Sequence, residues 1–153
     1  MEQLKEGMKA PSFEGIDQDG KMVKSGDFAG KKIVLYFYPK DNTPGCTSEA
    51  CDLRDNYNTF LKKGFAVVGV SADSEISHKK FAEKYSLPFP IIADTNKKIL
   101  NDFGVWKPKS LYGKTFLGIA RTTYIIDEKG IIEKIISKVD TKAHSDQIFN
   151  MYQ

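Results

Sequence analysis

The chain has 153 residues, of which 41% are apolar and 28% charged, and its formal net charge is +3. The apolar content is too high for a disordered segment, and two cysteines are too few for a disulfide scaffold. The longest apolar runs are strand-sized, whereas a membrane-spanning helix needs about 20 residues. The lysines are scattered and do not form the basic stripe of a nucleic-acid binder. We expect one globular domain over residues 1–153 with no nucleic-acid or membrane partner, and a cytoplasmic location because Met1 to Lys9 lacks the apolar core of a signal peptide.

The first half of the chain predicts a strand, a helix and a second strand. Buried strands are indicated by two apolar runs rich in β-branched and aromatic residues, at 33–38 and 65–70. Between them, apolar residues recur at helical spacing until Gly64 ends the helix: Ala50, Leu53, Tyr57, Phe60 and Leu61. This order is the unit of a parallel sheet with a right-handed crossover.

The middle of the chain alternates helix and strand patterns. We expect helices over about 74–85 and 96–103, with a short strand at 90–93 between them. Residues 105–120 show no convincing periodicity. A segment of that length inside a compact domain is either a functional loop or an element that the pattern fails to reveal.

The last part of the chain completes the predicted fold. An antiparallel hairpin is indicated by the runs 122–126 and 131–136, which flank the turn-forming residues 127–130. A final helix is expected over about 142–152. A βαβ half followed by a ββα half is the layout of the thioredoxin-like fold, an α/β class with a central mixed sheet and helices on both faces. We predict this fold, with the middle helices inserted between the two halves.

Cys46 lies where the first strand leads into the first helix. Thr43 suits the position that caps the helix, and Pro44 suits the first helical position. Cys46 then lies in the first turn, where unpaired amides and the positive end of the helix dipole stabilise a thiolate. Because it shares a helical stripe with Ala50 and Leu53, its sulfur is expected to face the sheet. That edge of an α/β sheet is a usual place for a ligand site.

The second cysteine, Cys51, is too far from Cys46 for a disulfide in an intact helix. It lies about 140° around the helix and ~7.5 Å along it, which separates the two Cα atoms by roughly 8.6 Å. A disulfide needs about 4.4–6.8 Å. The two cysteines either never pair, or pair only when the first turns unwind.

Several other roles for Cys46 were weighed. It could be an inert core residue, because free cysteine behaves as a small hydrophobe. A zinc site would need His78 and His144, and neither falls in a ligand spacing, so we predict no metal site. A cysteine–histidine hydrolase would use one of these histidines, but we expect both to be exposed. A thioredoxin-style exchanger would have Cys-x-x-Cys, and the spacing here is Cys-x4-Cys.

Arg54 and Arg121 are the two arginines among the 23 basic residues. Arg121 opens a predicted strand, so its side chain either reaches solvent or contacts an oxyanion at the cysteine site, and the pattern favours neither. Arg54 has no predicted role. The sequence contains no dinucleotide fingerprint and no complete Walker A loop, so no cofactor is predicted.

The spacing of Pro39, Thr43 and Cys46, Pro-x3-Thr-x2-Cys, resembles the active-site signature of the peroxiredoxins. The longer string 38–51 is similar to the bacterioferritin comigratory protein, or peroxiredoxin Q, subfamily. Further similar stretches lie at 10–13, 69–73 and 121–127, so the resemblance covers nearly the whole chain.

The resemblance implies a thiol peroxidase that reduces hydrogen peroxide and organic hydroperoxides to water and alcohols. The Cys46 thiolate would attack the peroxide and become a sulfenic acid. Arg121, the Thr43 hydroxyl and the Cys46 amide would stabilise the developing charge. Pro39 would shield the sulfur from water, and Glu49 would orient the other groups.

The resemblance also implies how the cycle is completed. Cys51 would resolve the sulfenic acid of Cys46 as a disulfide, after local unwinding of the first helix. Thioredoxin, or a similar thiol donor, would then reduce the disulfide without any cofactor or metal. We expect a monomer or weak homodimer. Two alternatives share the fold: a thiol–disulfide carrier, and a redox sensor that signals to a partner. Neither needs an arginine that stabilises an oxyanion.

Overall fold

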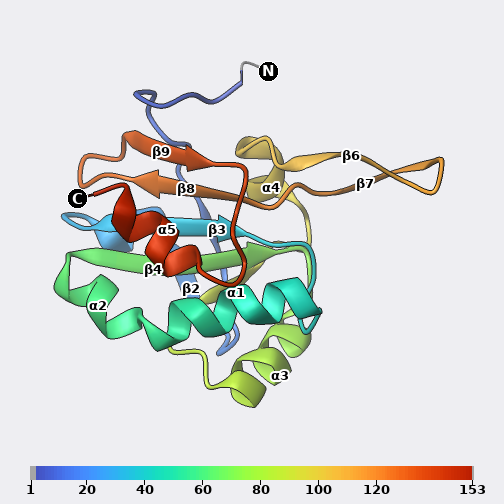
Figure 1. Ribbon diagram of the computed structural model, residues 1–153, viewed down its shortest axis with the longest axis horizontal. Coiled ribbons are helices and arrows are strands. Elements are labelled where there is room, and N and C mark those ends of the chain that lie inside the picture. The colour runs from blue at the N-terminus through green and yellow to red at the C-terminus, as the bar shows by residue number, and fades with distance from the viewer. Residues whose placement is uncertain (1–2, 153) are drawn as a thin grey trace.

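The computed structural model describes residues 3–152, which fold around one five-stranded sheet (Figure 1). The strands lie in the order β5 (Ile91–Ala93), β4 (Phe65–Ser71), β3 (Lys32–Phe37), β8 (Thr122–Ile126) and β9 (Ile132–Ile136). β3 pairs in parallel with β4, and β4 with β5, whereas β8 runs antiparallel to both β3 and β9. This mixed sheet, with a βαβ half and a ββα half, confirms the predicted thioredoxin-like fold.

The crossover between β3 and β4 contains two helices in place of the single predicted one. α1 (Pro44–Asp55) and α2 (Tyr57–Lys62) are separated at Asn56. The Asn56 side chain donates to the carbonyl of Asp52 at 2.9 Å, so it competes with the backbone for a helical hydrogen bond. The apolar spacing continues through this break, which is why the pattern alone did not reveal it. As predicted, the second helix ends before Gly64, whose φ is +84°.

Between the two halves lie α3 (Glu75–Tyr85) and α4 (Lys98–Asp102), close to the predicted helices. Ser74 begins α3 by accepting a hydrogen bond from the Ser77 amide, as an N-cap does. α4 is shorter than predicted, since Gly104 turns the chain and the Val105 amide bonds the Leu100 carbonyl. The last helix, α5, covers His144–Asn150. No helix within residues 3–152 is long and apolar enough to span a membrane.

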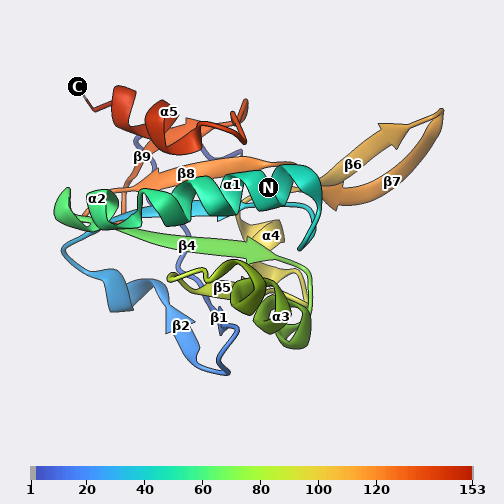
Figure 2. The same cartoon turned by 60° about the horizontal axis from the view of Figure 1, so that its bottom comes forward.

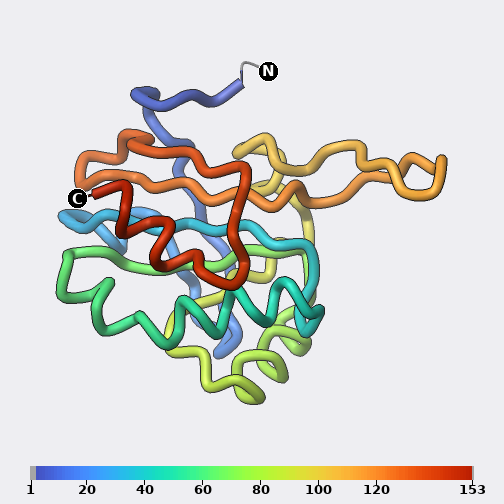
Figure 3. Tube along the Cα trace, viewed as in Figure 1, coloured from blue at the N-terminus to red at the C-terminus, as the bar shows by residue number. Residues whose placement is uncertain are grey.

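The sheet separates two hydrophobic clusters. One cluster joins the sheet to α1, α2, α3 and α5, and it includes Cys46. The other joins the opposite face to α4 and to the N-terminal strands β1 (Glu14–Ile16) and β2 (Met22–Lys24), with the short 3-10 helix η1 (Ser25–Phe28) after them. These short N-terminal elements were not predicted. Before β1, the N-terminal segment runs beside β9, where the Gly7 amide donates to the Ile132 carbonyl (Figure 3).

Residues 105–120 form an element that the sequence pattern did not reveal. β6 (Trp106–Leu111) and β7 (Lys114–Ile119) pair as a hairpin that extends away from the sheet (Figures 1 and 2). Both faces of its outer part are exposed, so apolar and polar residues do not alternate. The turn residues Tyr112 and Gly113 both have positive φ, which is the geometry of a two-residue hairpin turn. Tyr-Gly is a weaker signal for that turn than Asn-Gly.

Candidate active site

Cys46 lies in the first turn of α1 and points into the core, as predicted. Thr43 precedes the helix in an extended conformation, and Pro44 is its first residue. The Cys46 side chain is only 1% exposed. The first amides of a helix have no carbonyl partner within it, and together with the helix dipole they favour negative charge at this end. The site therefore combines a nearly enclosed thiol with the positive end of a helix.

Arg121 reaches the cysteine from the segment between β7 and β8. Its Nη2 donates to the Cys46 sulfur at 3.3 Å, so the side chain turns to the thiol and not to solvent. Burial lowers the pKa of Arg121, but the charges of Cys46 and Glu49 outweigh this and raise it. A Cβ at position 45 would lie 3.2 Å from Nη2, so Gly45 leaves room for the guanidinium. A permanent positive charge thus lies against the sulfur.

Glu49 lies one turn beyond Cys46 and holds the other side of the guanidinium. Its Oε1 accepts from Arg121 Nη1 at 2.6 Å, and its side chain is fully buried. Burial raises the pKa of Glu49 to about 7, although the nearby Arg121 charge opposes the rise. The half-buried Arg121 therefore connects two buried side chains, Cys46 and Glu49.

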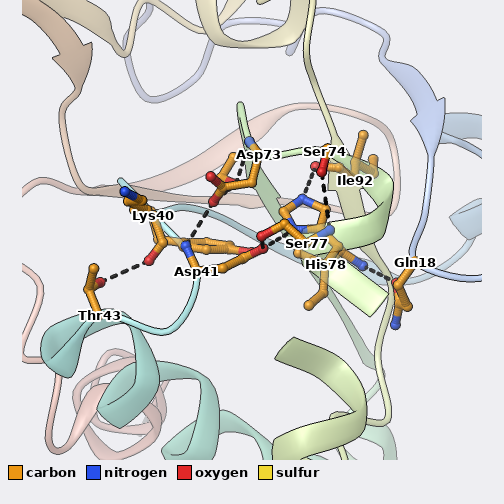
Figure 4. Close-up of polar contacts among 12 residues, drawn as sticks. Gln18, Lys40, Asp41, Thr43, Asp73, Ser74, Ser77, His78 and Ile92 are labelled. Carbon is orange, nitrogen blue, oxygen red and sulfur yellow. Dashed lines mark hydrogen bonds and ion pairs between the residues drawn. The ribbon is translucent and has the colours of Figure 1, made fainter. Parts of the chain in front are cut away.

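Thr43 and Pro39 belong to the segment that connects β3 to α1. The Thr43 hydroxyl donates to the Lys40 carbonyl at 2.8 Å (Figure 4), so it stabilises this loop in place of capping the helix. Pro39 directly follows the buried Tyr38 and is half-buried. Both residues lie on the loop that leads into α1, as the sequence predicted.

The same loop is anchored by Asp41, which sequence reasoning did not select. Its carboxylate is 4% exposed and accepts from the Tyr38 hydroxyl at 2.6 Å and the Ser77 hydroxyl at 2.7 Å. His78 Nδ1 lies 2.7 Å from the same carboxylate (Figure 4). The Asp41 amide donates to Asp73 at 2.7 Å. The loop before Cys46 is therefore fixed to the start of α3.

His78 is buried, so the prediction that it is exposed is wrong. Its Nδ1 faces Asp41 and its Nε2 lies 3.0 Å from the Ile92 carbonyl. One ligand atom each from Asp41, Asp73 and His78 lies within 4.8 Å of the others, which is close enough to hold a metal ion. These atoms already bond one another or nearby N–H and O–H groups, so a cation would have to displace existing hydrogen bonds.

His144 is also buried, and the prediction that it is exposed is wrong too. It opens α5, which packs onto α1: the Ser145 amide donates to Asp52 at 2.7 Å. His144 Nε2 lies 2.8 Å from the Thr123 hydroxyl and 3.7 Å from Glu49. The usable sequence signal was helical spacing, because His144 and the buried Ile148 share one face of α5.

Cys51 lies farther along α1 and is half-buried. α1 is continuous from Pro44 to Asp55, and within residues 3–152 neither cysteine forms a disulfide. The structure also supplies a contact for Arg54, which had no predicted role. Its Nη1 donates to the Tyr85 carbonyl at 2.7 Å, so it ties α1 to the end of α3, away from the thiol.

The chain is similar to proteins of known family. Residues 7–135 match the AhpC/TSA family. Peroxiredoxin Bcp of Bacillus subtilis (strain 168) is 48% identical over 138 residues, which cover 90% of this chain and 88% of that protein. Peroxiredoxin Bcp of Escherichia coli (strain K12) is 43% identical over 150 residues, covering 98% and 96%.

Solved structures show the same relationship. The bacterioferritin comigratory protein of Xanthomonas campestris superposes with a TM-score of 0.88 at 32% identity, over 96% of each chain. A cysteine-to-serine mutant of Xylella fastidiosa PrxQ superposes with a TM-score of 0.92 at 28% identity, over 99% of this chain and 97% of that one. The chain therefore belongs to the AhpC/TSA family: it is a peroxiredoxin, a thiol peroxidase related to Bcp and peroxiredoxin Q.

Proposed function

We propose that Cys46 is the peroxidatic cysteine and that the observation carrying this role is its contact with Arg121 at 3.3 Å. The thiolate attacks the terminal oxygen of a hydroperoxide. A sulfur–oxygen bond forms, the oxygen–oxygen bond breaks, and the leaving oxygen takes a proton to become water or an alcohol. Cys46 is oxidised to a sulfenic acid, and the peroxide is reduced.

The reaction needs groups that stabilise negative charge. As the oxygen–oxygen bond breaks, charge develops on both peroxide oxygens. Arg121 Nη2 and the Cys46 amide are the donors proposed to face that charge, in the manner of an oxyanion hole, and the Thr43 hydroxyl joins them when its hydrogen turns away from the Lys40 carbonyl. Glu49 holds Arg121 from behind at 2.6 Å. Pro39 limits access of water to the sulfur.

Cys51 is proposed as the resolving cysteine, in an atypical two-cysteine cycle within one domain. Its thiol condenses with the Cys46 sulfenic acid, so that a disulfide forms and water leaves. In an intact α1 the two Cα atoms lie roughly 8.6 Å apart, beyond the range of a disulfide. The first turns must therefore unwind. Gly45, Thr47 and Ser48 are weak helix formers and reduce the cost of that step.

The substrate class is proposed to be hydrogen peroxide and organic hydroperoxides, and the reductant thioredoxin. Alkyl peroxide reduction is the activity described for the Xanthomonas campestris relative, which supports the organic substrates. No cofactor is proposed, because the thiolate, the hydroperoxide and a thiol donor account for every atom and electron of the cycle.

A coupled assay with NADPH, thioredoxin reductase, thioredoxin and peroxide tests the proposal. We expect turnover in the wild type and none in Cys46→Ser. Cys51→Ser should lose turnover but still be oxidised once at Cys46, which mass spectrometry detects as an added oxygen. Reduction of insulin disulfides without any peroxide consumption would favour a thiol–disulfide carrier in place of a peroxidase.

A further inference from the structure

One oxygen of the buried Glu49 carboxyl has no hydrogen-bond partner. Oε1 accepts from Arg121, but Oε2 is unpaired among the residues that the structure describes. The polar atom facing it is Nε2 of His144 at 3.7 Å, and both side chains are 0% exposed. An unsatisfied buried carboxylate oxygen is costly, so this contact needs an explanation.

The hydrogen bonds around His144 fix which ring nitrogen carries a proton. The amide of Gln147 is oriented by two backbone groups: its Nε2 donates to the Lys138 carbonyl at 2.8 Å, and its Oε1 accepts from the Asp140 amide at 3.0 Å. The same Oε1 lies 2.8 Å from His144 Nδ1. Because Oε1 can only accept, Nδ1 carries the hydrogen.

The proton that can be gained or lost is therefore the one on the other ring nitrogen, Nε2. It faces the Thr123 hydroxyl at 2.8 Å and Glu49 Oε2 at 3.7 Å. If His144 is neutral, Nε2 accepts from the Thr123 hydroxyl and offers no N–H to Glu49, so an ionised Glu49 leaves Oε2 without a donor. A proton on Nε2 gives Oε2 a facing N–H, and a proton on Glu49 removes the carboxylate charge.

We propose that Glu49 and His144 together hold one proton. His144 is a positioning residue: it sets the charge on Glu49, and that charge sets how strongly the Arg121 guanidinium stabilises the Cys46 thiolate. This inference rests on the proposed role of Cys46. It assigns a part in the peroxidase reaction to α5, which packs on α1.

Each element packed around this pair contributes a charged or titratable group. These groups are Arg121 before β8, Cys46 and Asp52 on α1, Asp140 before α5, and Tyr36 on β3. Burial raises the pKa of Glu49 to about 7 and lowers the pKa of His144. Below about pH 7 the proton therefore resides on Glu49, and His144 Nε2 accepts from the Thr123 hydroxyl.

The charge state of Glu49 affects how Arg121 acts on the thiol. When Glu49 holds the proton, the full guanidinium charge is available to the sulfur and to the peroxide oxygens. When Glu49 is ionised, the guanidinium is shared between two anions, because Nη1 contacts Glu49 and Nη2 contacts Cys46. The rate constant for oxidation of Cys46 should fall as Glu49 loses its proton.

Two measurements test the inference in a Cys51→Ser background, where Cys46 is the one remaining thiol. The first follows the Glu49 carboxyl carbon by NMR as pH is varied. The second measures the rate constant for Cys46 oxidation by hydrogen peroxide over the same range. We expect a falling limb in the rate, with the same midpoint as the Glu49 titration.

His144→Gln tests the role of the histidine. It places an amide N–H where Nε2 lies, so the carboxylate gains a permanent donor and becomes more stable. The Glu49 midpoint and the falling limb should both move down by about one pH unit or more. Glu49→Gln should abolish the limb, and it tests the proposal even if His144→Gln does not fold. His78→Gln is the matched control, because it alters the other buried histidine and should leave the Glu49 midpoint unchanged.

An unmoved Glu49 midpoint in His144→Gln would overturn the inference, as would a falling limb that persists in Glu49→Gln. The NMR titration does not depend on catalysis. If Cys46 fails to react with peroxide, the proposed function is wrong, and the Glu49 midpoints still decide whether His144 controls the proton.

Discussion

Two buried histidines each face a buried carboxyl group, and they differ in how completely the hydrogen bonds of that carboxyl are satisfied. His78 lies 2.7 Å from the Asp41 carboxylate, which also accepts from two hydroxyl groups. His144 lies 3.7 Å from the Glu49 carboxyl, whose second oxygen is unpaired among residues 3–152. A satisfied network resists change, whereas a partly satisfied one responds to a proton. The Asp41–His78 network fixes the loop before Cys46. In the other site, Glu49 contacts Arg121, which acts on the thiol.

The largest expected effect comes from removing the imidazole of the satisfied pair. His78→Leu leaves Asp41 as a buried charge without its partner, which should lower the free energy of unfolding by about 3–5 kcal/mol. His144→Leu leaves hydrogen bonds to Thr123 and Gln147 unmade but strands no charge, so it should cost about 1–3 kcal/mol. Urea unfolding of both variants measures the difference. Equal losses would contradict the contrast between the two sites.

The next effect concerns Arg121, the side chain that joins Glu49 to the thiol. Arg121→Gln removes the charge that faces the developing peroxide anion, so the rate constant for Cys46 oxidation should fall by about 10²–10³-fold. Rapid-mixing kinetics with hydrogen peroxide measures this rate. Arg54→Gln is the matched control: it removes the other arginine, which bonds the Tyr85 carbonyl, and should leave the rate unchanged. A fall below tenfold in Arg121→Gln would contradict the role of the guanidinium.

The Glu49–His144 site also predicts that the free energy of unfolding depends on pH. Burial raises the pKa of Glu49 from 4.5 to about 7. Between these values the folded protein holds a proton that the unfolded chain has released, so the free energy of unfolding falls as pH rises, by about 3 kcal/mol in total. Glu49→Gln should remove this slope, and Glu83→Gln, at an exposed position on α3, should retain it. Denaturant unfolding at several pH values gives the comparison, and parallel curves for wild type and Glu49→Gln would refute it.

The smallest effect tests how closely Arg121 is packed. Gly45→Ala adds a methyl group 3.2 Å from Nη2, which should displace the guanidinium slightly and lower the oxidation rate a few-fold. The same change should raise stability by about 0.5–1 kcal/mol, because alanine favours a helix over glycine. Kinetics and thermal unfolding of one variant would thus move in opposite directions. A stabilised variant with an unchanged rate would show that the contact with Gly45 is unimportant.

The central strands and the position of the thiol could be predicted from local sequence. β3, β4 and β8 are short apolar runs that are buried along nearly their whole length, so composition reveals them without any partner. The facing of Cys46 follows from helical periodicity. For Arg121 the sequence left two options open, a side chain that reaches solvent or one that contacts the cysteine site. The choice depends on how β8 pairs with β3, which sets the distance between Arg121 and Cys46.

The buried histidines and the hairpin could not be predicted, for a different reason. His144 acquires its environment from Glu49 and Thr123, which are remote in sequence and meet it only when α5 packs on α1. His78 lies on a lysine-rich helix and His144 in a polar C-terminal segment, and both settings suggest an exposed side chain. Each histidine nevertheless occupies a buried position of its helix. In the β6–β7 hairpin, exposure of both faces removes the alternation on which strand prediction depends.

Cys46 is proposed to be oxidised by peroxide and then resolved by Cys51 through unwinding of α1. The most direct measurement is hydrogen exchange of the α1 amides, with mass spectrometry of the cysteines, before and after one equivalent of hydrogen peroxide. We expect a Cys46–Cys51 disulfide together with loss of protection in the first turns of α1, and retained protection in peroxide-treated Cys51→Ser. A disulfide formed while α1 keeps its full protection, or peroxide treatment that leaves Cys46 unoxidised, would contradict the account.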